Sequence, residues 1–502
     1  MKKILINDAP WQTRVAITDE QGLQNIYFWS HASNQLERSF YKGVVTKVLP
    51  GIQTAFVDIG EEKAGFMHIS EIDRELAINR MSDNFGGLDS TEKTPTEKRQ
   101  PADISKILKE GDSLLVQVTK EPVDQKGAKL TTCFTLPGRF LVLMPSIPRI
   151  GISKKIEDRD ERNRLRDVVM AQLPEGMGAI IRTCAENRTA QEIAHDVTFL
   201  LEIWHSILAN EKEAIAPAKI YEDLDLAFQV VRDHLDNDIE EVLCDNPETI
   251  KKLVKFVKGI GPEHVHKIKE YVGHTPLFEK YDIEKQIKNC LRKKVDLKSG
   301  GSIVIEATEA MTVVDVNTGR FIGKSNMEDT ILKTNIEAAQ EVTRQLKVRN
   351  IGGLIVIDFI DMANYGNRQK LFKFFEKTLK EQDKFQSVLL KISEFGLVQM
   401  TRKRSGKTLD RQLTDPCSHC TGTGLTPSVQ AESYALLRHL HQELLNKKIK
   451  GDIVIKLNPS IFDYIARTEY NTVLNFEKEL ASKITLESEQ SLPIGSFTIH
   501  KC

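Results

Sequence analysis

Three polar residues near the ends of two apolar segments could together bind a divalent cation. Asp315 and Asn317 lie in MTVVDVN, and Asp358 lies in LIVIDFID. Carboxylate and amide oxygens are ligands that suit Mg²⁺ or Mn²⁺, whereas zinc favours nitrogen and sulfur. A divalent cation lowers the pKa of bound water and polarises phosphate, so these residues, combined with a basic run further along the chain, indicate phosphodiester chemistry.

A second candidate metal site is the cysteine pair in DPCSHCTGTG. Cys417 and Cys420 have the Cys-x-x-Cys spacing of half a structural zinc site, which takes four ligands. The other five cysteines stand singly: Cys133, Cys184, Cys244, Cys290 and Cys502. The simplest way to supply the two missing ligands is with the same two cysteines of a second chain, which gives a Cys₄ site on a two-fold axis. A thiol oxidoreductase is the alternative, but it needs a helix directly after the pair, where TGTG favours a loop.

A strand, a helix and a second strand must position the acidic residues. A period of two in MTVVDVN places Asp315 and Asn317 on one face. Ser325 and Glu328 have capping-box spacing at the start of a helix that ends near Gly352. If the flanking strands are parallel neighbours, Asp315 and Asp358 share the crevice at their carboxyl ends. The alternative is that Asp358 or Asp361 only caps the following helix.

An earlier part of the chain predicts a small barrel. Residues 41–72, 112–119 and 128–132 alternate β-branched and polar residues between Gly and Pro. About five such strands indicate an OB-type barrel, which commonly binds single-stranded nucleic acid. Phe56 and Phe66 suit base stacking beside phosphate contacts from Lys42, Lys47 and Lys126. The alternative is that both phenylalanines belong to the barrel core.

The composition of the chain limits the class of protein and the compartment that it fits. With 70 Lys and Arg against 71 Asp and Glu, the net charge of −1 argues against a protein that coats nucleic acid indiscriminately. An odd number of irregularly spaced cysteines fits a reducing compartment, and no apolar run is long enough for a membrane span or a signal peptide. We expect a cytoplasmic chain.

Two further segments have recognisable patterns. Residues 221–275 show helical spacing. A basic run offers a phosphate-binding wall of Lys391, Arg402, Lys403, Arg404, Lys407 and Arg411.

Several long motifs, in order, resemble the ribonuclease E/G family: YKGVVTKVLPGIQTAFVDIG, LTTCFTLPGRFLVLMP, VDVNTGRF, NIGGLIVIDFIDM, FGLVQMTRKR and the cysteine pair before TGTG. The resemblance covers residues 3–425 and is greater to the shorter branch of the family. It implies a multidomain α/β fold with an inserted β-barrel (OB-fold) domain. The implied parts are an RNase H-like subdomain (1–38 and 226–290), the OB-fold domain (39–125), a 5′-end sensor region (126–225), a DNase I-like catalytic subdomain (291–412), a zinc link (413–425) and a small C-terminal α/β domain (426–502).

The resemblance also implies roles for individual residues. Asp315 and Asp358 would hold catalytic Mg²⁺, and Asn317 would orient the scissile phosphate. Cys417 and Cys420 would share Zn²⁺ between two chains. A pocket for an RNA 5′-monophosphate would comprise Arg182, Thr183, Gly138 and Val142. Contacts to RNA would come from Phe56, Phe66, Lys126, Lys154 and Lys155, the last two replacing arginines of the family.

The function implied is a Mg²⁺-dependent endoribonuclease specific for single-stranded RNA. It would prefer 5′-monophosphorylated ends, leave 5′-phosphate and 3′-hydroxyl ends, and serve ribosomal RNA 5′-end maturation and messenger RNA decay. The assembly would be a homodimer or a dimer of dimers. A non-catalytic RNA-binding protein that works through its barrel, with structural carboxylates, is the alternative.

Overall fold

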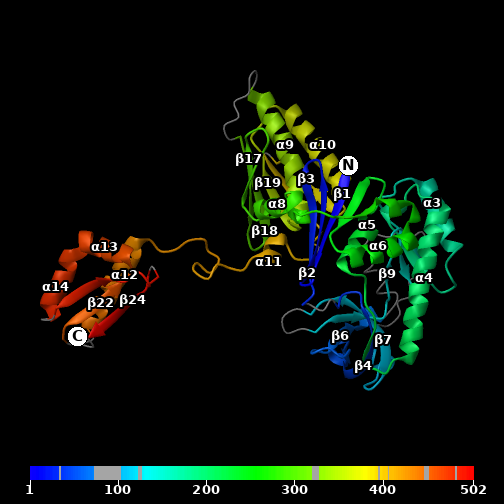
Figure 1. Ribbon diagram of the computed structural model, residues 1–502, viewed down its shortest axis with the longest axis horizontal. Coiled ribbons are helices and arrows are strands. Elements are labelled where there is room, and N and C mark those ends of the chain that lie inside the picture. Colours follow the sequence, from blue (N-terminus) through cyan, green and yellow to red (C-terminus); the bar gives the residue numbers. More distant parts are fainter. Residues whose placement is uncertain are drawn as a thin grey trace. The chain divides into compact units, whose positions relative to one another are not determined.

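The computed structural model describes the chain except for residues 33–35, 73–102, 123–126, 319–326, 394–395, 405, 446–450, 481–482, 494 and 502. It divides into two compact units, Met1–Asp410 and Arg411–Cys502 (Figure 1). The first unit contains the barrel and three further sheets, and the second contains one small sheet.

The sheet that carries the acidic residues has six strands in the order β16-β17-β18-β19-β21-β20. Strands β18 and β19 are parallel, and every other neighbouring pair is antiparallel. The strands are β16 (Lys294–Asp296), β17 (Ser302–Ala307), β18 (Met311–Asn317), β19 (Gly353–Asp358), β20 (Ser387–Leu389) and β21 (Leu397–Arg402). The two long helices that connect them are α9 (Met327–Val348) and α10 (Tyr365–Gln382).

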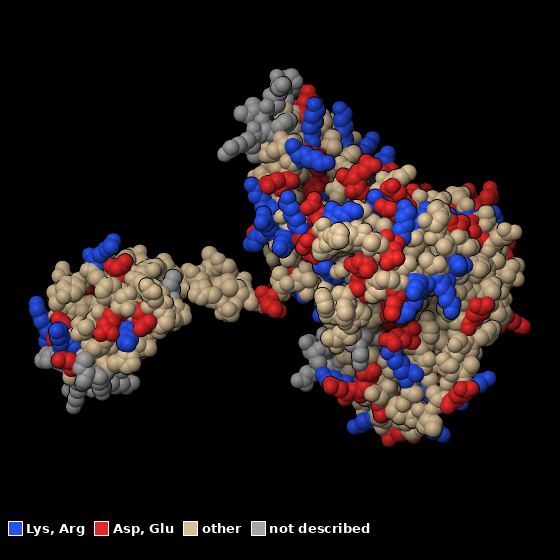
Figure 2. Space-filling model, viewed as in Figure 1, with Lys and Arg blue, Asp and Glu red and all other residues tan. Residues whose placement is uncertain are grey.

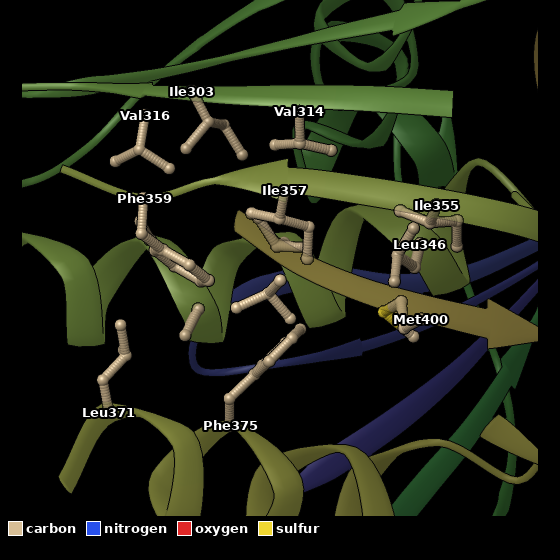
Figure 3. Close-up of a cluster of buried hydrophobic side chains, with 14 of the residues drawn as sticks. Ile303, Val314, Val316, Leu346, Ile355, Ile357, Phe359, Leu371, Phe375 and Met400 are labelled. Atoms are coloured by element: carbon tan, nitrogen blue, oxygen red, sulfur yellow. The ribbon is translucent and has the colours of Figure 1, made fainter. Parts of the chain in front are cut away.

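Helices α9 and α10 cover one face of this sheet and leave the other open. Alternate residues of the central strands, such as Val314, Val316 and Ile357, are buried against the helices (Figure 3). From the helices, Leu346 and Phe375 complete this core. The period of two along β18 therefore places Asp315 and Asn317 on the exposed face, as the sequence predicts.

The connection from β18 to β19 bears out the expected crossover helix. Ser325, the first member of the predicted capping box, lies outside the described residues. Glu328, its other member, accepts hydrogen bonds from the Ala363 amide (3.0 Å) and the Asn367 side chain (3.2 Å). This carboxylate thus ties the first turn of α9 to the beginning of α10.

A five-stranded sheet has the order β15-β14-β1-β2-β3. Its strands are β1 (Lys2–Ala9), β2 (Gln12–Asp19), β3 (Gly22–Ser30), β14 (Ile239–Cys244) and β15 (Ile268–Glu270). Along β1, Ile4 and Ile6 face helices α5 (Leu226–His234) and α6 (Pro247–Ile260), whereas Leu5 faces α7 (Leu277–Lys280) and α8 (Ile283–Cys290). Burial on both faces explains why Ile4, Leu5 and Ile6 are consecutive apolar residues in β1.

Strand β14 contradicts the helical expectation for residues 221–275. Its residues IEEVLC pair in parallel with β1, so that Ile4 lies beside Val242. The same six residues also fit helical spacing, since a short apolar pattern is ambiguous between the two periods. Pairing with the N-terminal strand β1 decides that these residues form a strand.

The predicted barrel is confirmed. Five strands close in the order β4-β5-β6-β8-β7 and back to β4, and β13 adds to β4 outside the ring. The strands are β4 (Phe40–Leu49), β5 (Thr54–Asp58), β6 (Gly65–His68), β7 (Ser113–Lys120), β8 (Lys129–Thr131) and β13 (Ala218–Tyr221). A short helix, α2 (Ile104–Ile107), precedes β7, and side chains such as Val45, Val57 and Met67 fill the interior.

A four-stranded sheet follows the barrel in the order β11-β12-β10-β9. Its elements are β9 (Leu136–Pro137), β10 (Leu141–Met144), β11 (Ile150–Ile152), β12 (Gly178–Ile181), α3 (Arg159–Met170) and α4 (Ala190–Glu213). Thr189 and Glu192 form a reciprocal capping box that starts α4. Trp204 of α4 and Phe40 of β4 belong to one shared core, which joins this sheet to the barrel.

The second unit is a small α/β domain, as predicted. It has a three-stranded sheet ordered β23-β22-β24. The elements are α12 (Val429–Leu445), β22 (Ile453–Leu457), α13 (Pro459–Tyr464), α14 (Tyr470–Leu480), β23 (Ile484–Ser488) and β24 (Phe497–Lys501), while α11 (Leu409–Leu413) spans the boundary between the units. Leu436, Ile455 and Ile465 lie in its core.

Candidate active site and RNA-binding surface

Asp315 and Asp358 are direct neighbours across the parallel pair β18 and β19. Both are exposed at the carboxyl ends of their strands, on the face that α9 and α10 do not cover. The structure therefore brings together the two carboxylates that the sequence singled out. Neither Asp358 nor Asp361 caps α10, because Asn364 occupies that position and its side chain accepts from the Gly366 amide at 2.7 Å.

The electrostatics of the pair favour a cation. Partial burial raises the pKa of Asp358, and the negative charges of Asp315 and Asp361 raise it further. A divalent cation between the carboxylates would relieve this repulsion. Asn317 donates a hydrogen bond from Nδ2 to Asp315 Oδ2 at 2.7 Å, which holds the Asp315 carboxylate in place.

The donors at this site are oxygens, which suit Mg²⁺ or Mn²⁺ better than zinc. Within the described ranges, no group of three or more His, Cys, Asp or Glu side chains is arranged to hold a metal ion. Mg²⁺ is usually held by one or two carboxylates and completes its octahedron with water and substrate phosphate. Two exposed carboxylates beside open solvent are what such a site requires from the protein.

The barrel presents a row of side chains outside its core. Lys47, Phe56, Phe66 and Lys129 are successive cross-strand neighbours on β4, β5, β6 and β8. The two phenylalanines are half-buried and do not belong to the barrel core, so the alternative in which they fill the interior is wrong. Paired aromatic rings beside Lys47 suit stacked bases with their phosphates nearby, whereas Lys129 donates to the Glu71 carboxylate.

The structure describes one of the two other lysines expected near these rings. Lys126 lies outside the described residues. Lys42 donates to the main-chain oxygens of Glu211 (2.8 Å) and Ala214 (3.0 Å), so it ties β4 to the end of α4.

Replacing Phe56 or Phe66 by alanine should weaken RNA binding by about 1–3 kcal/mol per lost stacking contact. The measurement is fluorescence anisotropy with a labelled single-stranded oligoribonucleotide in the presence of EDTA. Phe56→Trp, which keeps an aromatic face, is the matched control and should bind like the wild type. Unchanged affinity of both alanine variants would exclude a stacking role.

Arg182 is held in place by main-chain and carboxylate oxygens. Its Nη1 donates to Gly138 O (2.7 Å) and Asp233 Oδ1 (2.7 Å). Burial is the largest single effect and opposes the charge of Arg182, but Asp233, Cys184 and Asp196 together raise the arginine pKa. Burial would raise the pKa of Asp233, yet the positive charges of Arg232 and Arg182 hold it well below its usual range. Asp233 was not identified from the sequence, since nothing local to it signals this partner.

The other residues of the expected 5′-phosphate pocket have different surroundings. Thr183 is exposed, and its Oγ1 lies 2.9 Å from Ser153 Oγ. Val142 is buried, with 5% of its surface exposed. A Cβ at Gly138 would lie 2.6 Å from Asp196 Oδ2, so this glycine is needed for close packing. Thr183 and Arg182 are thus the pocket residues best placed to meet a ligand.

The predicted basic residues divide into free and structural ones. Lys154 is exposed, and Lys155 donates to the main-chain oxygen of Lys384 at 3.1 Å. Arg402 is buried and binds Asp383 through Nε (2.6 Å), which removes it from the predicted phosphate-binding wall. The reason is the strand period of β21, which turns Arg402 to the core side. Lys and Arg side chains do gather over the part of the first unit where β17 and β18 lie (Figure 2).

Cys417 and Cys420 lie in a series of turns before α12, not at the N-terminus of a helix. The Gly424 amide lies 3.3 Å from Cys420 Sγ, and this contact, with the Gly422 amide, lowers the pKa of the thiol. A thiolate held by backbone N–H groups is a good zinc ligand. The described part of the chain supplies two sulfurs here, so a tetrahedral site needs two more from elsewhere.

Comparison with known proteins places these features in a family. The ribonuclease E/G family model matches residues 135–405, an S1 RNA binding domain matches 38–132, and the thioredoxin-like domain of RNase E/G matches 416–502. Ribonuclease G of Escherichia coli (strain K12) is 39% identical over 441 residues, 87% of each chain, and ribonuclease G of Haemophilus influenzae is 34% identical over 97% of each chain. Ribonuclease E of H. influenzae is 35% identical over this whole chain and 52% of its own length.

The matched S1 domain coincides with the closed barrel, and the family match includes the strands of Asp315 and Asp358. Among the residues that the structure describes, no helix is long and apolar enough to cross a membrane. The chain belongs to the ribonuclease E/G family and is an endoribonuclease with an S1 RNA-binding domain.

Proposed function

We propose that this endoribonuclease is Mg²⁺-dependent, acts on single-stranded RNA, prefers a 5′-monophosphate end and leaves 5′-phosphate and 3′-hydroxyl ends. The observation that carries the proposal is the pair Asp315 and Asp358, in register on the open face of the sheet. By relationship to proteins named ribonuclease G, we propose bacterial ribosomal RNA 5′-end maturation and messenger RNA decay in the cytoplasm.

Asp315 and Asp358 would hold Mg²⁺, which supplies water of lowered pKa and polarises the scissile phosphate when bound. Asn317 keeps Asp315 oriented toward the site through its 2.7 Å hydrogen bond. Water attacks phosphorus in line with the 3′ oxygen, the P–O3′ bond breaks, and the leaving oxygen takes a proton to become the 3′ hydroxyl. The phosphate remains on the downstream fragment as its 5′ end. Bases stacked on Phe56 and Phe66 would hold the single strand extended.

The test is incubation of purified protein with a 5′-monophosphorylated single-stranded oligoribonucleotide, with Mg²⁺ or with EDTA. Internal cuts that require Mg²⁺ support the proposal. Cuts that continue in EDTA would contradict metal dependence, and intact RNA at saturating protein would favour the purely RNA-binding alternative, for which the barrel would be the working part.

Replacing Arg182 by alanine should erase any preference for 5′-monophosphorylated over 5′-triphosphorylated RNA. A guanidinium and a neighbouring hydroxyl can bind a terminal phosphate dianion through charge-assisted hydrogen bonds, and alanine removes the charge. The measurement is the ratio of kcat/KM for the two substrates. A ratio equal to that of the wild type would contradict a 5′-phosphate pocket at Arg182.

A further inference from the structure

Lys384 connects the catalytic sheet to the surroundings of Arg182. It lies between α10 and β20, next to Asp383, whose carboxylate binds Arg402 of β21. Its Nζ donates to the main-chain oxygen of Asp233 at 2.9 Å. The carboxylate of the same Asp233 accepts from Arg182 at 2.7 Å. One residue at the end of α5 therefore holds two cations from different parts of the chain.

A neutral histidine orients the Lys384 ammonium. His234 Nδ1 lies 3.3 Å from Lys384 Nζ, and burial, followed by the charge of Lys384, lowers the His234 pKa to about 3. Nδ1 is therefore an acceptor, and the ring proton sits on Nε2, which lies 3.3 Å from the Tyr27 hydroxyl. An ammonium has three N–H donors, so two directed at Asp233 and His234 leave one for a ligand.

The charges around Arg182 and Lys384 do not balance. Arg182, Arg232 and Lys384 are close to Asp233, and buried Asp196 is the other carboxylate that acts on Arg182. Asp196 is satisfied by the main-chain amides of Arg139 (3.0 Å), Phe140 (2.8 Å) and Leu141 (3.2 Å). Three cations thus face two carboxylates, and one of these carboxylates is already fully hydrogen-bonded. The group therefore carries a surplus positive charge, which a phosphate dianion would more than neutralise.

Lys384 is also close to the polar turn that contains Thr183. The positive charges of Arg182 and Lys384 both act on the Cys184 thiol. Burial of its ammonium group lowers the pKa of Lys384, and the neighbouring charge of Arg182 lowers it further. Part of the Lys384 side chain remains exposed to solvent. Arg182 and Lys384 are thus two positive charges gathered around Asp233 and next to the turn of Cys184, an arrangement that can bind an anion.

We propose that Lys384 is a further 5′-phosphate-binding residue, which donates its remaining N–H to the terminal phosphate of the RNA. The proposal rests on the function proposed above and adds a residue to the same pocket. Because Asp383 is bound to β21, and β21 pairs with the strand of Asp358, a phosphate held by Lys384 is tied to the sheet that cleaves the RNA. The 5′ end would thereby be positioned relative to the carboxylate pair.

The test compares Lys384→Met with Lys384→Arg, using one oligoribonucleotide that carries either a 5′-monophosphate or a 5′-hydroxyl. Loss of a charge-assisted hydrogen bond should lower the preference for the monophosphate about tenfold or more in Lys384→Met, through KM. The 5′-hydroxyl substrate should be cleaved at the wild-type rate. Lys384→Arg should retain most of the preference. Lys380→Met, an exposed neighbour near Glu376 (3.7 Å), is the matched control and should change nothing.

Two results would overturn the proposal. An unchanged preference in Lys384→Met, while Arg182→Ala loses it, would show that the pocket exists without Lys384. Equal losses on both substrates with a lower melting temperature would show that Lys384 is only a structural link. If the wild type itself does not distinguish the two 5′ ends, the pocket proposed at Arg182 fails, and the role of Lys384 fails with it.

Discussion

Replacing either Asp315 or Asp358 by asparagine is expected to lower RNA cleavage by about a thousandfold or more and to leave RNA affinity unchanged. Asparagine keeps the size of the side chain and removes the negative charge that holds a divalent cation. Both residues are exposed on the open face of the sheet, outside its core, so the fold should tolerate the change. Binding should persist because Phe56 and Phe66, the residues proposed to stack on RNA bases, lie on a separate barrel.

The measurement pairs single-turnover cleavage with anisotropy binding at matched Mg²⁺ concentration. Asp296→Asn is the matched control, since Asp296 is an exposed carboxylate of β16 in the same sheet. It should cleave like the wild type. Wild-type rates for both Asp315→Asn and Asp358→Asn would remove the assignment of these residues to catalysis.

Replacing Cys417 by serine is expected to convert a zinc-linked dimer to monomers. We propose that Cys417 and Cys420 of two chains complete one tetrahedral Cys₄ site, because each chain offers two closely spaced sulfurs in exposed turns. Structural zinc contributes about 10 kcal/mol or more of apparent free energy, enough to hold a dimer at micromolar concentration. Losing one sulfur per chain removes two of the four ligands.

Native mass spectrometry at low protein concentration, with zinc content measured on the same sample, tests this expectation. His419→Ala is the control, since His419 lies between the cysteines and is not a ligand in this arrangement. It should remain a dimer with one zinc per two chains. A zinc-bound monomer of the wild type would mean that the site has a ligand within its own chain.

The juxtaposition of Asp315 and Asp358 could be predicted from the sequence because local rules determine it. The period of two along β18 and a crossover helix to a parallel neighbour place Asp315 beside Asp358. The barrel could be predicted for a similar reason, since its strands are joined mostly by short connections. In both cases the residues that are brought together lie on strands whose arrangement follows from their order in the sequence.

Long-range pairings could not be predicted in the same way. Asp233 lies 51 residues from Arg182 and binds it only once the fold brings the end of α5 to the residue that follows β12. Strand β14 has a helical pattern, and its form is decided by pairing with β1. Arg402 belongs to a basic run, but the alternation of β21 turns it toward Asp383 and the core. Each of these outcomes depends on a partner that local sequence does not reveal.

The most direct test of metal-assisted hydrolysis at Asp315 and Asp358 is cleavage in water enriched in heavy oxygen, followed by mass spectrometry of the fragments. Attack by water predicts one heavy oxygen in each new 5′-phosphate and unlabelled 3′-hydroxyl ends on the upstream fragments. Both products should depend on Mg²⁺ and disappear in Asp315→Asn. Unlabelled fragments with 2′,3′-cyclic phosphate and 5′-hydroxyl ends would contradict the account, because they would arise from attack by the RNA's own 2′-hydroxyl.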